Sequence, residues 1–516
     1  MPPARPDIRY LFVSDLHLGE ENSLLSNLRR DRYAIDPLHA SPVLEQWVVC
    51  LRQLLADNAT PPTLVLNGDA LDLAFGTISQ ALMNFERLLE LLLPPGQALV
   101  SRILYLPGNH DHHVWEIARE TQYVRTILAT HRPEGLPEPQ HATPLDQSAT
   151  VPSFLLNQIL RHVVHHDHHE HAGESLEGES LGVEVAYPNL GLAAAGGGRY
   201  LVVHHGHYVE RLYHLLSDLR RWVFADREAP ATVHELEAEN FAWIDFVWSL
   251  LGRSGAAGTD VEAFFKMLHY PEQVEHLATS LAERVAAARN IPGVPGDWLE
   301  SRVLGMLFRW LASRVSSPRQ SHGADVEQAI DAGLRSYLFG PTIRQLEDEL
   351  GHVPGDLAFV FGHTHKPFER LIRQRPGAHG ARAAQRRAVS VVNTGGWTVD
   401  SCTPHSEKGA SLLVADENLE MVALRLFDEP APGAEVAPVR VVAVGAERPG
   451  TRALAAEVER RIRPGGRLDP AWSTLTAGIG QAIGVRRNWL ERAFSGPGPR
   501  SRGSRMSKVN PDRGSG

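Results

Sequence analysis

The stretch Pro107-Gly108-Asn109-His110-Asp111-His112 gives the pattern that the rest of the chain repeats. It follows Ile103-Leu104-Tyr105-Leu106, a continuous apolar run of the kind that forms a strand covered on both faces. The strand therefore ends in a turn whose side chains are an amide, an imidazole and a carboxylate. These groups bind metal ions and carry protons, so we expect chemistry at this end of the strand.

The same arrangement occurs at four other places in the chain, where an apolar run meets a short polar motif. The motifs are Ser14-Asp15-Leu16-His17, Asn67-Gly68-Asp69, His204-His205-Gly206-His207 and Gly362-His363-Thr364-His365. If the strands lie side by side and mainly parallel, their carboxyl ends share one rim, which is where open α/β sheets place their sites. The sequence therefore predicts a single site built from five strands.

Length and composition are those of an ordinary globular protein with a large core. The chain has 516 residues, of which 43% are hydrophobic and 22% are charged. Its formal net charge of −10 argues against a polyanion-binding surface, so nucleic acid is not favoured as a partner. Two cysteines, Cys50 and Cys402, exclude a disulfide framework and favour a reducing compartment. The start lacks a signal-peptide core and no apolar run reaches about 18 residues, so we expect a cytoplasmic protein.

Alternating strand and helix patterns predict a layered α/β fold for the first part of the chain. Helical periodicity covers Val43 to Asp57 and about Ile78 to Leu93, between the first three strand-like runs. From about 208 to 350 the pattern is almost entirely helical, which predicts a large helical cap inserted into the domain. We therefore expect a domain over residues 1–427 that this cap interrupts.

Strand character returns after the cap, and the last part of the chain changes composition. Strands are expected at Ala388 to Val392, Ser411 to Val414 and Met421 to Leu426. Residues 428–495 then form a C-terminal extension with short helices. Residues 496–516, which are rich in Gly, Pro, Ser and Arg, form a tail that we expect to be disordered.

The side chains of the five motifs are carboxylates, imidazoles and an amide, without a thiolate. Such donors suit Mn²⁺, with Fe or Zn²⁺ as alternatives, whereas the imidazoles argue against Mg²⁺ and Ca²⁺. Seven candidate ligands exceed what one ion needs, so we predict two divalent metal ions. The predicted ligands are Asp15, His17, Asp69, Asn109, His205, His363 and His365.

Two neighbouring metal ions, bridged by a carboxylate and a hydroxide, make a nucleophile at neutral pH and bind the oxygens of a phosphoryl group. The predicted reaction is therefore in-line attack at phosphorus, in which positioning and charge neutralisation supply most of the catalysis. The leaving oxygen then needs a proton. We assign this donation to His110, with Asp111 keeping the imidazole oriented and charged.

In this order, the motifs resemble the pattern of the calcineurin-like metallophosphoesterases: Asp-x-His, Gly-Asp, Gly-Asn-His-Asp/Glu, a lone His and Gly-His-x-His. The resemblance covers roughly residues 8 to 427. It implies a four-layer α/β/β/α sandwich of two sheets flanked by helices, and His110 as proton donor or transition-state stabiliser. It also implies that Asp15, His17 and His365 bind one metal ion, that Asn109, His205 and His363 bind the other, and that Asp69 bridges them.

The fourth motif offers three histidines for one role. We assign the role to His205, because the family's ligand commonly precedes Gly directly, as His205 precedes Gly206. If strand alternation continues to the end of the run, His204 points the opposite way.

The motifs do not fix the substrate, because members of this family differ in what their insertions admit. The UDP-2,3-diacylglucosamine pyrophosphatases, which act on a lipid-nucleotide, resemble the start Asp15-Leu16-His17-Leu18 but usually carry Arg where this chain has His110. The repair nucleases of the superfamily resemble the run Ser14 to Gly19. A phosphorylated small molecule or protein is the third class of substrate. A metal-stabilised binding scaffold is the alternative that is not an enzyme.

Several features outside the motifs have both a structural and a functional interpretation. Asp72 is either a neighbour of the metal ligands or the cap of the following helix. The tract His162 to His171 is a solvated loop or an accessory metal-binding loop. The aromatic stretch Phe241 to Leu251 packs within the cap, or it contacts a lipid substrate or a membrane peripherally. These choices and the oligomeric state stay open.

Overall fold

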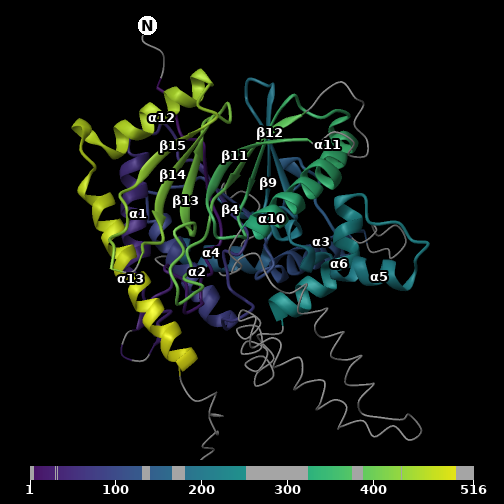
Figure 1. The fold of residues 1–516 in the computed structure, drawn as a ribbon, viewed down its shortest axis with the longest axis horizontal. Helices are drawn as coiled ribbons and strands as arrows, with labels where there is room; N and C mark the ends of the chain where they lie inside the picture. Colours follow the sequence, from purple (N-terminus) through teal and green to yellow (C-terminus); the bar gives the residue numbers. More distant parts are fainter. Residues whose placement is uncertain are drawn as a thin grey trace, which may run out of the picture.

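The computed structural model describes residues 5–29, 31, 33–130, 140–165, 181–250, 324–374, 387–431 and 433–495. Within this part of the chain, two sheets pack face to face and helices cover both outer sides, which confirms the predicted α/β/β/α sandwich (Figure 1). Three predictions fall wholly or partly outside the described residues. They concern the middle of the cap at 251–323, most of the His-rich tract at 166–171, and the tail at 496–516.

The larger sheet has the strand order β15-β14-β13-β1-β4-β5-β7-β6. The parallel strands at its centre are β1 (Tyr10–Val13), β4 (Thr63–Asn67), β5 (Arg102–Leu106) and β7 (Val183–Val185). The strands that join by antiparallel pairing are β13 (Gly409–Ala415), β14 (Met421–Asp428), β15 (Arg440–Val444) and β6 (Val151–Pro152). β15 lies beyond the predicted end of the domain at residue 427, yet it pairs with β14 in this sheet.

The smaller sheet has the order β11-β12-β10-β9-β8. Its strands are β8 (Asn189–Ala193), β9 (Arg199–His204), β10 (Asp356–Phe361), β11 (Phe368–Arg373) and β12 (Ala388–Asn393), of which β9, β10 and β12 are parallel. The five motif strands are divided between the two sheets: β1, β4 and β5 belong to the larger sheet, and β9 and β10 belong to the smaller. Each is covered on both faces because the two sheets bury their inner faces against each other, for example through Phe12, Val65, Val203 and Val360.

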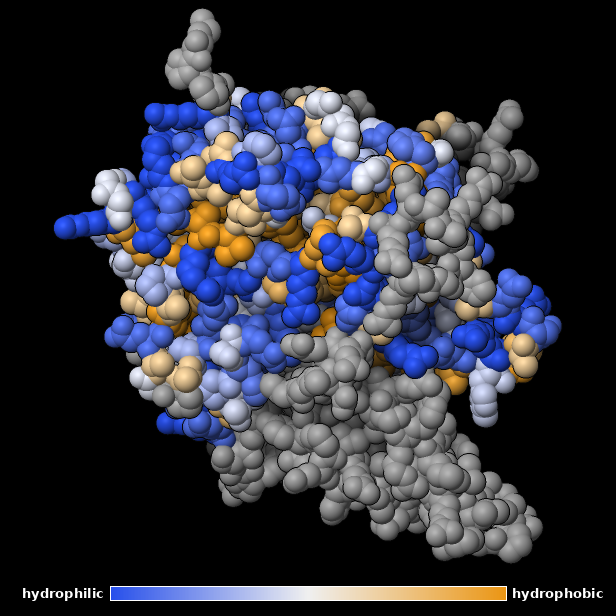
Figure 2. Space-filling model, turned by 45° about the horizontal axis from the view of Figure 1, so that its top comes forward, coloured by the Kyte–Doolittle hydropathy of each residue, from blue (hydrophilic) through white to orange (hydrophobic). Residues whose placement is uncertain are grey.

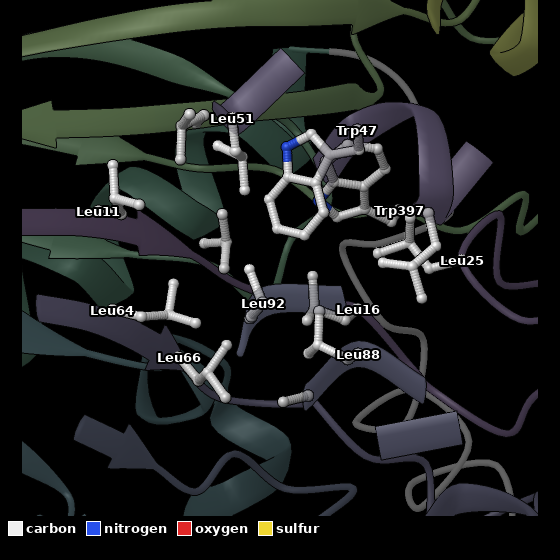
Figure 3. Close-up of a cluster of buried hydrophobic side chains, with 14 of the residues drawn as sticks. Leu11, Leu16, Leu25, Trp47, Leu51, Leu64, Leu66, Leu88, Leu92 and Trp397 are labelled. Carbon is white, nitrogen blue, oxygen red and sulfur yellow. The ribbon is translucent and has the colours of Figure 1, made fainter. Parts of the chain in front are cut away.

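Helices on the outer face of the larger sheet bury the largest apolar cluster. They are α1 (Pro42–Leu55), α2 (Ile78–Leu92), α3 (His113–Thr130), α4 (Phe154–His165), α12 (Pro449–Ile462) and α13 (Pro470–Ser495). Figure 3 shows the centre of this cluster, where Trp47 of α1 packs on Trp397 among leucines, with ring centroids 5.3 Å apart. α2 begins at a capping box of Thr77 and Gln80, which fixes its first turn.

The outer face of the smaller sheet is covered by helices that follow β9 and precede β10. They are η2 (His207–Val209), η3 (Arg211–His214), α5 (Leu215–Val223), α6 (Val233–Ile244), the π-helix η4 (Asp245–Leu250), α10 (Ala324–Tyr337), the π-helix η6 (Leu338–Thr342) and α11 (Ile343–Leu350). The short elements elsewhere are β2 (Leu28–Arg29), β3 (Ala34–Ile35), η1 (Gln147–Ala149) and η7 (Pro464–Gly466). The described flanks of the predicted cap are thus helical and pack on the sheet.

The aromatic stretch of the predicted cap is only partly exposed. Ile244 and Trp248 are buried in the core cluster of the smaller sheet, whereas Phe246 is 57% exposed. On the face drawn in Figure 2, most described residues are hydrophilic, with smaller hydrophobic areas between them. None of the described helices has the length and apolar character needed to cross a membrane. Packing therefore accounts for Ile244 and Trp248, and a lipid-contacting surface stays a prediction.

The helix α13 shares a core with α1, so its packing can be tested by mutation. Trp472 is fully buried, and its indole Nε1 donates a hydrogen bond to Oε1 of Gln53 in α1 at 2.5 Å. We expect Trp472→Ala to lower the free energy of unfolding by about 3–5 kcal/mol, because the missing ring leaves a cavity. Urea denaturation measures the change, with Thr474→Ala on the exposed side of the same helix as control. A loss below about 1 kcal/mol would contradict this packing.

Candidate metal centre

The polar motifs of both sheets meet at one rim, formed by the carboxyl ends of β1, β4, β5, β9 and β10. All seven predicted metal ligands are buried there, each at most 2% exposed. Among the described residues, four overlapping clusters bring possible ligand atoms within 4.8 Å of one another: Asp15 with His17 and His365, His17 with Asp69 and His110, Asp69 with His205 and His363, and His17 with Glu20 and Asp72. The motifs therefore form one site, although the strands that carry them belong to two sheets.

The predicted ligands form two halves, the first with Asp15, His17 and His365 and the second with Asn109, His205 and His363. Asp69 lies between these two halves. Its Oδ2 atom is 3.7 Å from Nε2 of His17 on one side and 3.2 Å from Nε2 of His205 on the other. In the first half, Nε2 of His365 is 3.2 Å from Oδ1 of Asp15. The structure thus places a carboxylate at the junction and a second carboxylate among the imidazoles of one half.

The second half contains the amide and two imidazoles. Nε2 of His205 is 3.2 Å from Oδ1 of Asn109 and 3.2 Å from Nδ1 of His363. Glu210 lies on the far side of His363, with Oε1 3.1 Å from Nε2. The structure brings the residues together in the two groups that the resemblance implied, and their role as metal ligands stays a prediction.

Five of these side chains project from strained backbone. Their φ angles lie between 46° and 68°, a region that residues with a Cβ rarely adopt. The residues are Asp15, His17, Asp69, His363 and His365. Such strain persists where the surrounding structure compensates for it, and it concentrates at functional sites. The sharp turns after β1, β4 and β10 therefore aim these side chains at a common centre.

At two positions, a glycine is needed because a larger side chain would overlap a candidate ligand. A Cβ atom added to Gly68 would lie 2.1 Å from Nδ1 of His205, and the φ of +84° at this position also favours glycine. A Cβ added to Gly362 would lie 2.3 Å from Oδ2 of Asp15. The glycines of these motifs therefore permit close approach of the two sheets at the rim.

The donor atoms fit a divalent metal ion. They are carboxylate oxygens, an amide oxygen and imidazole nitrogens, a set that suits Mn²⁺, Fe or Zn²⁺. Nδ1 of His17 donates to Oδ2 of Asp72 at 2.9 Å, so Nε2 carries the lone pair. Nε2 is buried and makes no hydrogen bond to any residue that the structure describes. A buried lone pair that faces carboxylates is unfavourable unless a cation lies between them, so the geometry fits a bound metal.

The charges of the site also favour cations. Burial alone would raise the pKa of Asp69, but His205 and His110 hold it well below its usual range. Burial acts on Asp72 in the same way, and His110 and His17 hold its pKa well below the usual range as well. Both carboxylates are therefore ionised at neutral pH, and ionised carboxylates are suitable ligands for divalent cations.

His110 lies at the edge of the cluster, with its ring paired to Asp72. Nδ1 donates to Oδ2 of Asp72 at 3.0 Å, and this oxygen also accepts from His17. The ring centroids of Phe75 and Trp248 are 5.3 and 6.1 Å away. Burial lowers the pKa of His110, while Asp69 and Asp72 act in the opposite direction. The ring is thus held by a carboxylate at one nitrogen and enclosed by apolar rings.

Asp111 does not take the role predicted for it. Its carboxylate accepts hydrogen bonds from the backbone N–H groups of Gly108 at 2.6 Å and Leu71 at 3.2 Å, and from the hydroxyl of Tyr105. Burial and the charge of Asp69 raise its pKa to about 6. Asp111 therefore ties two motif turns together, and Asp72 is the residue that orients His110.

Asp72 also fixes the turn before α2, although it is not the cap of that helix. Its Oδ1 atom accepts hydrogen bonds from the backbone N–H groups of Phe75 at 2.7 Å and Gly76 at 3.3 Å, in the turn before α2. One carboxylate thus fixes this turn through Oδ1 and the two imidazoles through Oδ2. Asp72 therefore contacts the predicted ligand His17, whereas the interpretation as the cap of α2 is wrong, because that cap is Thr77.

The other two histidines of the fourth motif lie outside the ligand clusters. The ring of His204 packs on Tyr337, with centroids 4.5 Å apart, and burial holds its pKa well below its usual range. Nε2 of His207 is 3.4 Å from the hydroxyl of Tyr187. His205 is therefore the histidine of this motif that reaches Asp69, and its assignment as the metal ligand stays a prediction.

The sequence patterns did not identify two residues that lie next to the predicted ligand His365 and hold its ring in place. Nδ1 of His365 donates to Oδ2 of Asp400 at 2.8 Å, and Nζ of Lys408 lies 2.9 Å from the same oxygen. Asp400 and Lys408 follow no apolar run, so no strand pattern marked them. The stretch Asn393 to Trp397 precedes Asp400 and contacts the rim, since Nδ2 of Asn393 donates to the carbonyl of Gly362 at 2.8 Å.

Comparison with known proteins agrees with this geometry. Residues 8–247 match the family model of the calcineurin-like phosphoesterases, while no curated protein matches the chain. The matched segment ends before β10, and the structure adds His363 and His365 to the same rim. The family implies a hydrolase that acts on phosphoesters with divalent metal ions. Residues 8–247 are therefore a calcineurin-like phosphoesterase domain, which supports the assignment to the metallophosphoesterase superfamily.

Proposed function

We propose that this chain hydrolyses phosphoesters with two divalent metal ions, for which Mn²⁺ is the best candidate. The observation that supports this most strongly is the position of Asp69, whose Oδ2 atom faces His17 and His205 from between the two halves. A carboxylate shared by two ions is the usual core of such centres. The proposed ligands are Asp15, His17 and His365 for one ion, Asn109, His205 and His363 for the other, and Asp69 for both.

When bound, such ions activate a water molecule and neutralise the charge on the phosphoryl oxygens. The protein's own contribution is His110. Because Nδ1 of His110 donates to Asp72, Nε2 is the nitrogen that gives a proton to the leaving oxygen. Asp72 fixes the ring and stabilises its protonated form, and Phe75 and Trp248 limit the access of water.

The carboxylate behind His365 provides a test of the first half of the centre. In Asp400→Asn, one acceptor oxygen becomes an amide that repels the N–H groups of His365 and Lys408. We expect the affinity for Mn²⁺ to fall about 10–100-fold, because an oriented imidazole is a stronger ligand. Titration of chelator-treated protein with Mn²⁺ measures this, with the exposed Glu417→Gln as control. Equal affinities in the two variants would contradict the role of Asp400.

Hydrolysis of two artificial esters tests the proposed activity and its ester class. Chelator-treated protein is assayed with and without added Mn²⁺ on p-nitrophenyl phosphate and on bis-p-nitrophenyl phosphate. A reaction without protein is the blank. We expect Mn²⁺ to restore hydrolysis of at least one. Preference for the first ester indicates a phosphatase, and preference for the second a phosphodiesterase. A lipid-nucleotide and single-stranded DNA then test the two narrower alternatives. Hydrolysis of neither simple ester with two ions bound would favour the binding scaffold.

A further inference from the structure

A buried ionic network connects α6 with the turns of the metal centre, and the proposed chemistry does not use it. At its centre is Glu237 of α6, which is fully buried. Its Oε1 atom accepts from Nε2 of His112 at 2.9 Å, and its Oε2 atom accepts from the hydroxyls of Tyr187, at 3.0 Å, and Tyr208. A buried carboxylate is strongly destabilising without such donors, so the network is a specific arrangement.

His112 has a carboxylate at each ring nitrogen. Its Nδ1 atom lies 3.4 Å from Oδ1 of Asp245, the first residue of η4, and the ring is fully buried. Because both carboxylates accept hydrogen bonds, both nitrogens carry a proton and the ring is positively charged. Burial alone would lower the pKa of His112, but the hydrogen bonds to Asp245 and Glu237 raise it to about 10. Glu237 therefore faces a permanent buried cation at neutral pH.

Two of the three partners of Glu237 follow the strands that carry the second half of the centre. His112 follows Asn109 in the turn after β5, and Tyr208 follows His205 in the turn after β9. Across these turns, Oδ1 of Asn109 is 3.2 Å from Nε2 of His205. One carboxylate of a helix outside all five motifs thus links the backbones that carry two predicted ligands of the same ion.

The segment after α6 contacts the same turn directly. The hydroxyl of Ser249 in η4 donates to the backbone carbonyl of Asn109 at 3.0 Å. Asp245 lies 3.2 Å from Nδ1 of His113, and the ring of Trp248 is 6.1 Å from that of His110. These contacts place α6 and η4 against the active-site turn from Asn109 to His113.

On the basis of the proposed function, we propose that Glu237 is a positioning residue. It fixes the turn after β5 against the turn after β9, and it thereby sets the separation of Asn109 and His205. α6 and η4 are then part of the active site, and the second metal ion depends on a helix that the family motifs do not include. The first half of the centre, with Asp15, His17 and His365, makes no contact with Glu237 among the described residues.

The two ions provide a readout that separates positioning from general stability. In full-length Glu237→Gln, we expect the first Mn²⁺ to bind as in the wild type and the second at least tenfold more weakly. On the p-nitrophenyl ester that the wild type prefers, kcat falls at least tenfold at saturating substrate and KM changes less than threefold. The matched control is Glu239→Gln on the same helix, whose carboxylate pairs with the half-exposed Arg220. Equal affinity for the second ion in the two variants would overturn the proposal.

A double variant tests whether Glu237 acts only through stability. Glu237→Gln with His112→Asn removes both buried charges, so we expect the thermal midpoint of the metal-free protein to rise above that of the single variant. The affinity for the second ion should stay low, because the link between the turns is still missing. Recovery of stability and affinity together would overturn the positioning role.

A milder variant covers the case in which Glu237→Gln does not fold. Tyr208→Phe removes one hydrogen bond to Glu237 without changing charge. We expect at least threefold weaker binding of the second Mn²⁺, and an unchanged value would overturn the proposal.

These binding data are independent of turnover. A wild type that binds two ions and hydrolyses neither ester contradicts the proposed function, whereas hydrolysis with an unaffected second ion in Glu237→Gln contradicts the positioning role alone.

Discussion

His110→Asn is expected to lower kcat by about 100- to 10,000-fold without changing the metal content, because an amide cannot donate the proton that the leaving oxygen needs. His110 lies at the edge of the ligand cluster, and its ring is oriented by Asp72 at 3.0 Å. Asparagine keeps a polar side chain of similar reach, so the turn between Asn109 and Asp111 should fold as before. Steady-state kinetics and elemental analysis of the same preparation measure the two quantities.

A control variant and two alternative outcomes decide the role of His110. The exposed His352→Asn is the control and should match the wild type. Wild-type turnover in His110→Asn would contradict the proton-donor role. Loss of a metal ion would instead make His110 a ligand, which its position within 4.8 Å of His17 and Asp69 allows.

Asp69→Asn is expected to abolish binding of at least one metal ion and to lower hydrolysis by on the order of 1,000-fold or more, because a neutral amide cannot bridge two cations. Asparagine is the best replacement for the backbone, since the φ of 49° at this position suits Asn. Its amide oxygen can also keep the hydrogen bond that Oδ1 accepts from the backbone N–H of His110 at 2.8 Å. The fold should therefore survive.

Metal content and thermal stability together decide the outcome for Asp69→Asn. The metal-free variant should melt near the metal-free wild type, which shows that the lost ions result from the lost charge and not from unfolding. As a matched control, the exposed Asp348→Asn should retain both ions. Two bound ions and wild-type turnover in Asp69→Asn would contradict a bridging carboxylate.

Much of the fold could be predicted because apolar patterns report burial directly. The predicted helix from Ile78 to about Leu93 corresponds to α2 (Ile78–Leu92), and the apolar runs before the motifs are β1, β4, β5, β9 and β10. Continuous apolar runs require cover on both faces, and each of these strands has it. The pattern therefore identified the strands, and the motifs identified their carboxyl ends.

The distribution of strands between sheets could not be predicted in the same way. An apolar run shows that a strand is buried, but it does not show which strand pairs with it, because pairing depends on distant parts of the chain. The residue pattern alone therefore suggested one shared sheet, and the resemblance supplied the second. Edge strands were missed because their patterns are weak: β11 (Phe368–Arg373) carries three charged residues, and β8 (Asn189–Ala193) contains Gly191.

In the candidate site, residues that directly follow a strand could be predicted from the sequence, whereas residues that depend on tertiary contacts could not. The seven predicted ligands follow strands directly, so strand direction alone brought them to the rim. Asp111 was assigned to His110 because it is the next residue, but the turn directs its carboxylate to the backbone of Gly108 and Leu71. Asp400 and Glu237 reach the site from segments without a motif, so only the folded structure reveals them.

The most direct test of the dinuclear centre is hydrolysis of the preferred p-nitrophenyl ester as a function of Mn²⁺ bound per chain. Chelator-treated full-length protein is titrated with Mn²⁺, and bound metal is measured by elemental analysis at each step. For a dinuclear centre we expect little hydrolysis up to one equivalent and recovery as the second ion binds, with saturation at two. Full hydrolysis by the metal-free protein, or two bound ions without hydrolysis of either ester, would contradict it.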